Sequence, residues 1–194
     1  MLEFFAPTVL ILATLLGPGT RAASIWPLPS IASYGDVNVA VQPSLHFFAM
    51  RGGVKAPDTL VMAFERYTKL TFPHRSEPIS SGSSSSTITS LVLDVDDLDE
   101  SHPQLGINET YTLDISAESG AATISAPNVY AAMRGLETFS QLVMFDFDNE
   151  FYQISEVPVH IWDAPRFPHR GLMIDSARHF ETLASIRNII DSLP

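Results

Sequence analysis

The sequence predicts an α+β fold: an antiparallel sheet with two helices on one face, followed by the truncated first strand–helix unit of a β/α (TIM) barrel. Three observations predict it. Alternating strand patterns recur between residues 37 and 161, amphipathic helical patterns cover 57–72 and 127–145, and an uninterrupted apolar run at 172–174 leads into polar residues. With 194 residues, 45% of them hydrophobic, the chain can build one domain with a core and part of another.

The first half of the chain predicts three strands and a helix. Residues 37–41 and 45–50 alternate between apolar and polar side chains, as strands do. Residues 57–72 predict a helix that begins with proline, and a serine-rich loop at 77–86 separates it from a strand at 87–95. The apolar residues at helical spacing are Leu60, Phe64, Tyr67 and Leu70.

The second half predicts a hairpin, a second helix and two short strands. Residues 110–116 and 121–126 alternate on either side of the turn at 118–120. Residues 127–145 predict a helix, and two short strands lie between 151 and 161 around a proline. The core stripe of this helix is Val129, Met133, Leu136, Phe139 and Val143. Because the strands come in hairpins, we expect an antiparallel sheet with both helices on one face.

Composition excludes several classes of protein. The net charge of −11 and the pI near 4.8 argue against a nucleic-acid partner, because phosphate binding needs a basic face. The absence of cysteine excludes disulfides, thiolate metal sites and cysteine nucleophiles. The six histidines share no ligand spacing, and no glycine-rich phosphate loop is present, so the sequence predicts neither a metal nor a cofactor.

The first 23 residues have the pattern of a secretory signal peptide. Residues 4–16 are almost wholly apolar, Gly-Pro-Gly at 17–19 breaks the run, and the small residues 22–24 suit cleavage. Because the segment has Glu3 and no basic residue ahead of the run, an uncleaved anchor is the alternative, but the run is short for a span of ~20 residues. We expect the secretory pathway, a vacuolar, lysosomal or extracellular destination, and no membrane attachment after cleavage.

Two polar loops carry candidate sites. Asn108 begins an Asn-Glu-Thr sequon, which predicts glycosylation in a secreted protein. The acidic run at 94–100 lacks the glycine and the closing glutamate of a calcium-binding loop, so it predicts a solvated surface and no metal site.

The segment after residue 170 has the pattern of a barrel strand. Residues 171–174 show no alternation, as expected of a parallel strand that is buried on both faces. Polar residues come next at its C-terminal tip, where a barrel places its site. Asp175 and Arg178 can pair there, and the planar guanidinium fork suits adjacent hydroxyls of a sugar. From chemistry alone, a purely structural Asp–Arg pair at a strand–helix junction is an equal alternative.

Residues 166–180 read Arg-Phe-Pro-His-Arg-Gly-Leu-Met-Ile-Asp-Ser-Ala-Arg-His-Phe. This segment resembles the start of the catalytic barrel of the β-N-acetylhexosaminidases, glycoside hydrolase family 20. The family pattern is Arg-Phe-x-x-Arg-Gly, three apolar residues, Asp, Thr or Ser, any residue, Arg-His and an aromatic residue. Ile-Trp-Pro-Leu-Pro at 25–29 resembles the mature N-terminus of the family, and residues 129–142 resemble its helix ahead of the barrel.

The resemblance implies an accessory α+β domain at 24–163 and the truncated start of a (β/α)8 catalytic domain at 164–194. It implies hydrolysis of terminal N-acetylhexosamine residues from glycans, with the acetamido oxygen of the substrate as nucleophile. Arg178 matches the family arginine that hydrogen-bonds hydroxyls of the terminal sugar, and Asp175 and His179 are its supporting residues. N-acetylhexosamine-terminated glycans would be partners of the full barrel, and the full-length form would be a homodimer.

Two motifs of the family are missing from the sequence. The His-x-Gly-Gly-Asp-Glu segment with the catalytic pair is absent, and so is the His-Trp-His stretch. A barrel needs eight units and ~250 residues, so we expect no catalytic residue and no hydrolysis in this chain. The alternative is a non-catalytic secreted module that binds a partner or a glycan through the accessory domain. We expect residues 170–194 to lie on that domain or to be poorly ordered, because their apolar side chains lack barrel neighbours.

Overall fold

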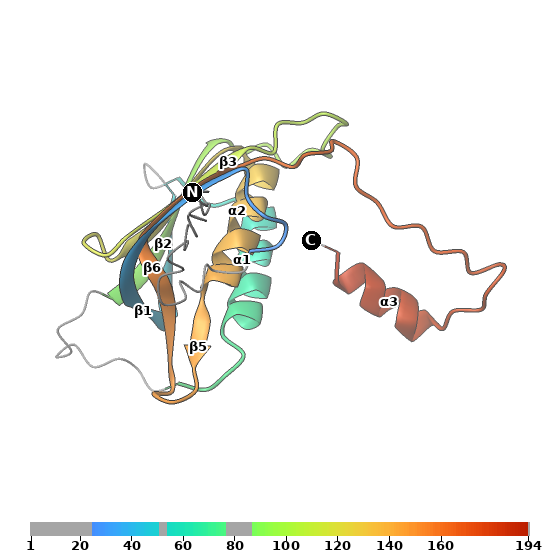
Figure 1. Ribbon diagram of the computed structural model, residues 1–194. Coiled ribbons are helices and arrows are strands. Elements are labelled where there is room, and N and C mark those ends of the chain that lie inside the picture. Colours follow the sequence, from blue (N-terminus) through green and yellow to red (C-terminus); the bar gives the residue numbers. More distant parts are fainter. Residues whose placement is uncertain (1–24, 51–53, 77–86, 194) are drawn as a thin grey trace, which may run out of the picture.

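A computed structural model describes residues 25–50, 54–76 and 87–193, and it contains a six-stranded mixed sheet with two helices on one face (Figure 1). A third helix lies beyond the sheet, near the C-terminus. No helix in these ranges is long and apolar enough to cross a membrane. The elements are β1 (Ile31–Met50), α1 (Asp58–Thr71), β2 (Thr87–Asp97), β3 (Tyr111–Ser116), β4 (Ala121–Asn128), α2 (Val129–Leu142), β5 (Met144–Asp146), β6 (Phe151–Asp163) and α3 (Leu183–Asp191).

The strand order is β1-β2-β4-β3-β6-β5, and β1 also pairs with β6. The first part of β1 runs antiparallel to β6, from Ile31 opposite Trp162 to Val41 opposite Tyr152. Its second part runs parallel to β2, and β2 runs parallel to β4. The prediction of an antiparallel sheet is therefore wrong for these two pairs. For β1 and β2, the physical reason is that α1 carries the chain back to the same end of the sheet before β2 begins, and such a crossover joins parallel strands. β4 runs parallel to β2 because it lies between β2 and β3 and returns antiparallel to β3.

The strand boundaries correct several predictions. The hairpin of β3 and β4 is confirmed. The segments predicted separately at 37–41 and 45–50 belong to one strand, β1, and the two short strands around Pro158 belong to β6. The second helix ends at Leu142, because residues 144–146 form β5 and pair with β6 instead of continuing the helix. The predicted serine-rich loop at 77–86 lies outside the described residues.

Both predicted helices of the domain are confirmed, but the predicted apolar stripe of α1 is only partly buried, because Leu70 is 62% exposed. α1 buries Leu60, Ala63 and Tyr67, which follow one another at helical spacing. α2 begins after Asn128, whose side chain accepts a hydrogen bond of 3.0 Å from the backbone N–H of Ala131. Gly135 lets α2 approach the sheet closely, since a Cβ at this position would lie 2.5 Å from the side chain of Ile124.

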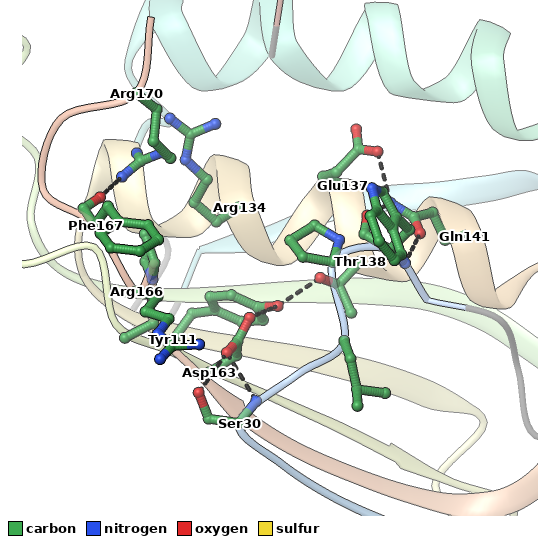
Figure 2. Close-up of a pocket in the computed structure, with 15 residues that line it drawn as sticks. Ser30, Tyr111, Arg134, Glu137, Thr138, Gln141, Asp163, Arg166, Phe167 and Arg170 are labelled. Atoms are coloured by element: carbon green, nitrogen blue, oxygen red, sulfur yellow. Dashed lines mark hydrogen bonds between the residues drawn. The ribbon is translucent and has the colours of Figure 1, made fainter.

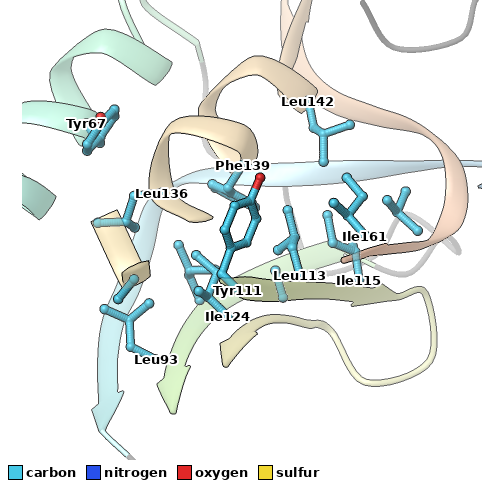
Figure 3. Packing of buried hydrophobic residues seen from close by; sticks show 14 of the residues in the cluster. Tyr67, Leu93, Tyr111, Leu113, Ile115, Ile124, Leu136, Phe139, Leu142 and Ile161 are labelled. Atoms are coloured by element: carbon cyan, nitrogen blue, oxygen red, sulfur yellow. The ribbon is translucent and has the colours of Figure 1, made fainter. Parts of the chain in front are cut away.

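The hydrophobic core fills the layer between the sheet and the two helices (Figure 3). β3 and β4 each contribute every second side chain to this layer, so that the same face of both strands is apolar. Close packing of this layer supplies most of the favourable free energy of folding. Its largest fully buried members include Leu60, Ile88, Leu93, Leu113, Ile115, Ile124, Leu136, Leu142, Tyr152 and Ile161.

The chain leaves the sheet after β6 and reaches α3 through residues 164–182, which contain neither a helix nor a strand (Figure 1). The predicted buried strand at 171–174 is wrong: the side chains of Leu172 and Met173 are 62% and 84% exposed. A parallel strand needs neighbours for its backbone N–H and C=O groups, and no described strand lies beside this segment. α3 has no buried residue, so of the two alternatives for this tail, the one in which it lies on the domain is wrong for α3.

Leu113→Ala should lower the free energy of unfolding by about 2–5 kcal/mol, because it removes a side chain that is 0% exposed and leaves a cavity between β3 and α2. The matched control is Leu105→Ala, which truncates a leucine that is 79% exposed and should change stability by less than about 0.5 kcal/mol. Chemical denaturation of both variants measures the difference. Equal losses in the two variants would contradict the assignment of the core.

Candidate functional site

A cavity of about 680 Å³ lies where the N-terminal segment, α2 and the segment after β6 meet (Figure 2). Its walls combine apolar rings with charged and polar groups, which is the usual composition of a small-molecule site. The lining residues are Trp26, Pro27, Leu28, Ser30, Tyr111, Arg134, Glu137, Thr138, Gln141, Asp163, Ala164, Pro165, Arg166, Phe167 and Arg170.

Hydrogen bonds from α2 and β6 hold the N-terminal segment against this cavity. The side chain of Gln141 accepts from the backbone N–H of Trp26 at 2.7 Å and donates to its carbonyl at 3.0 Å. One carboxylate oxygen of Asp163 accepts from both the backbone N–H and the hydroxyl of Ser30, each at 2.9 Å. The Trp26 ring takes no part in these bonds and is 82% exposed. The segment is thus fixed by its backbone, and its apolar side chains remain accessible at the mouth of the cavity.

Tyr111 forms the floor of the cavity on the β3 side. Its hydroxyl is hydrogen-bonded to Thr138 of α2 and lies within 3.4 Å of Asp163. Burial raises the pKa of Tyr111 to about 12; the hydrogen bond with Thr138 acts in the opposite direction, and the charge of Asp163 adds to the rise. Tyr111 is therefore neutral at physiological pH and serves as a hydrogen-bonding group, not as a base.

Glu109 joins the domain to the segment after β6. Its carboxylate, 11% exposed, accepts from Nε of Arg134 at 2.9 Å, and both of its oxygens accept from one terminal nitrogen of Arg170 at 2.7 Å. Burial acts to raise the pKa of Glu109, but the hydrogen bonds and charges of Arg170 and Arg134 together hold it below its ordinary value. The carboxylate consequently stays ionised and balances two guanidinium groups at the edge of the cavity.

The predicted pair of Asp175 and Arg178 is present, and it lies in a turn outside the cavity. One carboxylate oxygen of Asp175 accepts from the backbone N–H groups of Ala177 and Arg178, at 3.1 and 3.0 Å, and the other accepts from Nε of Arg178. These hydrogen bonds, first the backbone bond from Arg178 and then its side-chain bond, lower the pKa of Asp175. The Arg178 side chain is 79% exposed. The other predicted supporting residue, His179, donates through its backbone N–H to the carbonyl of Asp175, at 3.4 Å.

The glycosylation candidate Asn108 is exposed in the loop before β3. Its side-chain oxygen accepts from the backbone N–H of Thr110 at 3.0 Å, and its carbonyl accepts from Asn128 at 2.7 Å. The loop is therefore ordered around an accessible side chain, and glycosylation stays a prediction.

In the acidic run, Glu100 accepts from the backbone N–H of Thr59 at 2.6 Å, near the start of α1. Within the described ranges, no group of three or more His, Asp or Glu residues could hold a metal ion.

Sequence reasoning missed the residues of α2 that shape the cavity. Arg134, Thr138 and Gln141 lie on one face of α2, and their partners come from segments far away in the chain. The one available signal was the presence of these polar side chains beside the apolar stripe of the helix. Their spacing indicates that they share a face, but it does not identify what that face meets.

Comparison with known proteins identifies the family. Residues 25–142 match the family described as "beta-acetyl hexosaminidase like", and residues 167–194 match the catalytic domain of glycosyl hydrolase family 20. The chain belongs to the β-hexosaminidases of glycoside hydrolase family 20, and it comprises their N-terminal accessory domain and the start of their catalytic domain.

Curated relatives extend well beyond the matched region. The chain is 37% identical to Beta-hexosaminidase 1 of Arabidopsis thaliana, over 91% of this chain and 34% of that protein. It is 36% identical to Beta-hexosaminidase subunit B2 of Dictyostelium discoideum, over 90% of this chain and 30% of that protein. The chain thus spans about a third of the length of these relatives.

Solved structures share the fold. A chitobiase of Flavobacterium johnsoniae superimposes with a TM-score of 0.61 at 22% identity, over 85% of this chain and 24% of that chain. An N-acetyl-β-hexosaminidase of Streptomyces plicatus superimposes with a TM-score of 0.59 at 18% identity, over 91% of this chain and 33% of that chain.

Glu109→Gln should destabilise the domain at pH 7, and this loss should shrink in acid. Because the folded pKa of Glu109 lies below the unfolded one, the ionised carboxylate stabilises the fold above about pH 4.3. That contribution is lost as the pH falls from there through the folded pKa. Unfolding free energies of the natural chain and the variant, measured between neutral and acidic pH, test the expectation.

The control for this experiment is Glu118→Gln. Glu118 lies in the turn between β3 and β4 and forms no ion pair with the described residues. Its replacement should leave stability nearly unchanged at neutral pH. A Glu109→Gln effect that is constant from neutral to acidic pH would show that the two arginines do not act on an ionised carboxylate.

Proposed function

We propose that this chain is the N-terminal part of a β-N-acetylhexosaminidase, which removes terminal N-acetylhexosamine residues from glycans by substrate-assisted catalysis. The chain by itself is inactive in this proposal, because it lacks the Asp-Glu catalytic pair of the family. The observation that carries the proposal is the Asp175–Arg178 pair, which has the chemistry of a sugar-binding group and lies in the segment that matches the catalytic domain of the family.

Arg178 is the proposed substrate-binding residue. The hydrogen bonds of its guanidinium group to the described residues involve Nε and Asp175, and the side chain is 79% exposed. The terminal nitrogens are thus available to donate to two neighbouring hydroxyls of a sugar ring, for which the planar fork has suitable geometry. A fixed Nε limits the rotation of the group, so that less conformational entropy is lost when the sugar binds.

Asp175 and His179 support Arg178. Asp175 remains ionised at physiological pH, because its hydrogen bonds with Arg178 and Ala177 lower its pKa. It therefore orients the guanidinium group by charge as well as by hydrogen bonding. His179 fixes the turn through its backbone bond to Asp175.

In the proposed reaction the acetamido oxygen of the substrate attacks the anomeric carbon, and a glutamic acid protonates the leaving oxygen. A neighbouring aspartate orients the acetamido group. Both catalytic residues belong to the part of the family barrel that this chain does not include. Arg178 contributes by holding the terminal sugar in the position for this attack, which lowers the entropic part of the barrier.

The remaining properties of the whole enzyme are part of the same proposal. The apolar segment at 4–16 supports secretion, with a vacuolar, lysosomal or extracellular destination. An exposed sequon at Asn108 supports glycosylation in that pathway. A homodimer is proposed for the full-length form, and mass measurement of glycosylated full-length protein tests both properties.

The 194-residue chain should show no turnover of a chromogenic N-acetyl-β-glucosaminide above the rate in buffer. The physical reason is that no general acid is present to protonate the leaving group. The assay uses purified chain at high concentration, with a complete family member as the positive control. Clear turnover that co-purifies with the chain would contradict the proposed inactivity and would require a catalytic acid within these residues.

A longer chain that continues these residues through the catalytic pair should hydrolyse the same substrate, and Arg178→Lys should lower its kcat/KM about 100-fold, because a lysine cannot reproduce the two-pronged contact. The matched control is Arg187→Lys, on the exposed surface of α3, which should leave kcat/KM unchanged. An Arg178→Lys variant with full activity would remove Arg178 from the sugar site.

A further inference from the structure

A second hollow, of about 430 Å³, lies at the other end of β6 from the cavity of Asp163. Its lining residues come from the segment after α1 and from the turn between β5 and β6, which lie at the same end of the sheet (Figure 1). Since β6 has 13 residues, the two sites are about 40 Å apart along the strand. The lining residues of this aromatic hollow are His74, Arg75, Ser76, Phe145, Phe147 and Glu150.

Three aromatic rings form the apolar wall of the hollow. The ring centroids of His74 and Phe145 are 4.8 Å apart, those of His74 and Phe147 are 5.2 Å apart, and those of Phe145 and Phe147 are 5.1 Å apart. Behind them, the ring of the buried Tyr152 packs edge-on against Phe145 at 4.9 Å. The rings of the hollow are thus continuous with the hydrophobic core through Phe145 and Tyr152.

Hydrogen bonds fix the backbone on both sides of the hollow. The Tyr152 hydroxyl accepts from the N–H of His74 at 2.7 Å and donates to its carbonyl at 2.9 Å. Across the hollow, Asp146 accepts from the backbone N–H groups of Asp148 and Asn149, at 2.9 and 3.1 Å, and its carbonyl accepts from Glu150 at 2.8 Å. The wall is therefore rigid before any ligand arrives, which reduces the entropic cost of binding.

A purely structural role explains these rings only in part. Phe145 and Tyr152 join the turn to the core, and His74 ties the end of α1 to β6. Phe147 is different, because its ring is 73% exposed although it lies at the tip of an ordered turn. Most of its surface adds nothing to packing and remains available as a flat apolar platform.

The polar groups of the hollow indicate the chemistry of its ligand. Arg75 offers donors, Glu150 offers acceptors, and the hydroxyl oxygen of Ser76 is buried without a hydrogen-bond partner in the described structure. One cation and one anion suit a neutral ligand that can both accept and donate hydrogen bonds. A pyranose ring has one face of C–H groups and an edge of hydroxyls. The C–H face can stack on an aromatic ring, because the negative face of the ring attracts polarised C–H groups. The hydroxyls can form hydrogen bonds with the charged groups of the hollow.

We propose that the aromatic hollow binds a pyranose residue of a neutral glycan chain, with the sugar stacked on Phe147 and its hydroxyls directed to Arg75 and Glu150. This site is separate from Arg178 and needs no part of the catalytic barrel. It gives a specific location to the glycan-binding alternative that the sequence raised. The sequence concealed it because His74 and Phe147 lie on segments that only the folded sheet brings together.

The test is an NMR titration of the 194-residue chain with triacetylchitotriose, a neutral oligomer of β-linked N-acetylglucosamine. The expected result is saturable shifts of the backbone amides of His74, Arg75 and Phe147. Phe147→Leu, which keeps an apolar side chain but removes the aromatic face, should weaken binding by about two- to tenfold. Phe147→Trp should bind at least as tightly as the natural chain, because it keeps and enlarges that face.

The matched control is Phe180→Ala, which removes another exposed phenylalanine, 89% exposed, from the segment before α3 and should leave the affinity unchanged. No saturable shift around the hollow, or equal affinity in Phe147→Leu and the natural chain, overturns the proposal. Shifts confined to residues 175–179 also overturn it, since the sugar would then bind at Arg178. This test measures binding to a chain without a catalytic pair. A negative result would therefore leave the proposed hydrolase activity standing. Loss of the proposed hydrolase activity would likewise leave the glycan-binding proposal standing.

Discussion

The close packing of α2 on the sheet is the contact on which the rest of the structure depends. Gly135 brings the helix against Ile124, and this approach sets the height of every other α2 side chain above the strands. From the same helix, Arg134 reaches Glu109, Thr138 reaches Tyr111 and Gln141 reaches the backbone of Trp26. One helix position therefore fixes both the core and the polar contacts that shape the large cavity.

The hollows at the two ends of β6 differ in how they are built, and the difference follows from their places on this strand. At the end with Asp163, charged groups lie beside exposed apolar side chains, next to the segment that leads to the start of the catalytic domain. At the other end, aromatic rings rest on the core and are held by a rigid turn. The long strand β6 thus has the cavity of Asp163 at one end and the aromatic hollow, the proposed glycan site, at the other.

The segment after β6 contains local hydrogen-bonded features but no strand. The Asp175–Arg178 pair and α3 depend on hydrogen bonds within a few residues, and both are present. The strand expected at 171–174 depends on partners outside the segment, and it is not formed. Glu109 and Arg170 connect this segment to the domain by charge, close to where it leaves the sheet.

The sequence by itself determined the local features. Helical spacing identified α1 and α2, alternation around a turn identified the β3–β4 hairpin, and the motif at 166–180 identified the family and the Asp175–Arg178 pair. Only the tertiary structure decided the parallel pairing of β1 with β2, the grouping of Glu109 with its two arginines and the aromatic hollow. The physical reason is that periodicity records which face of an element is buried, whereas strand order and long-range side-chain contacts depend on which buried faces meet.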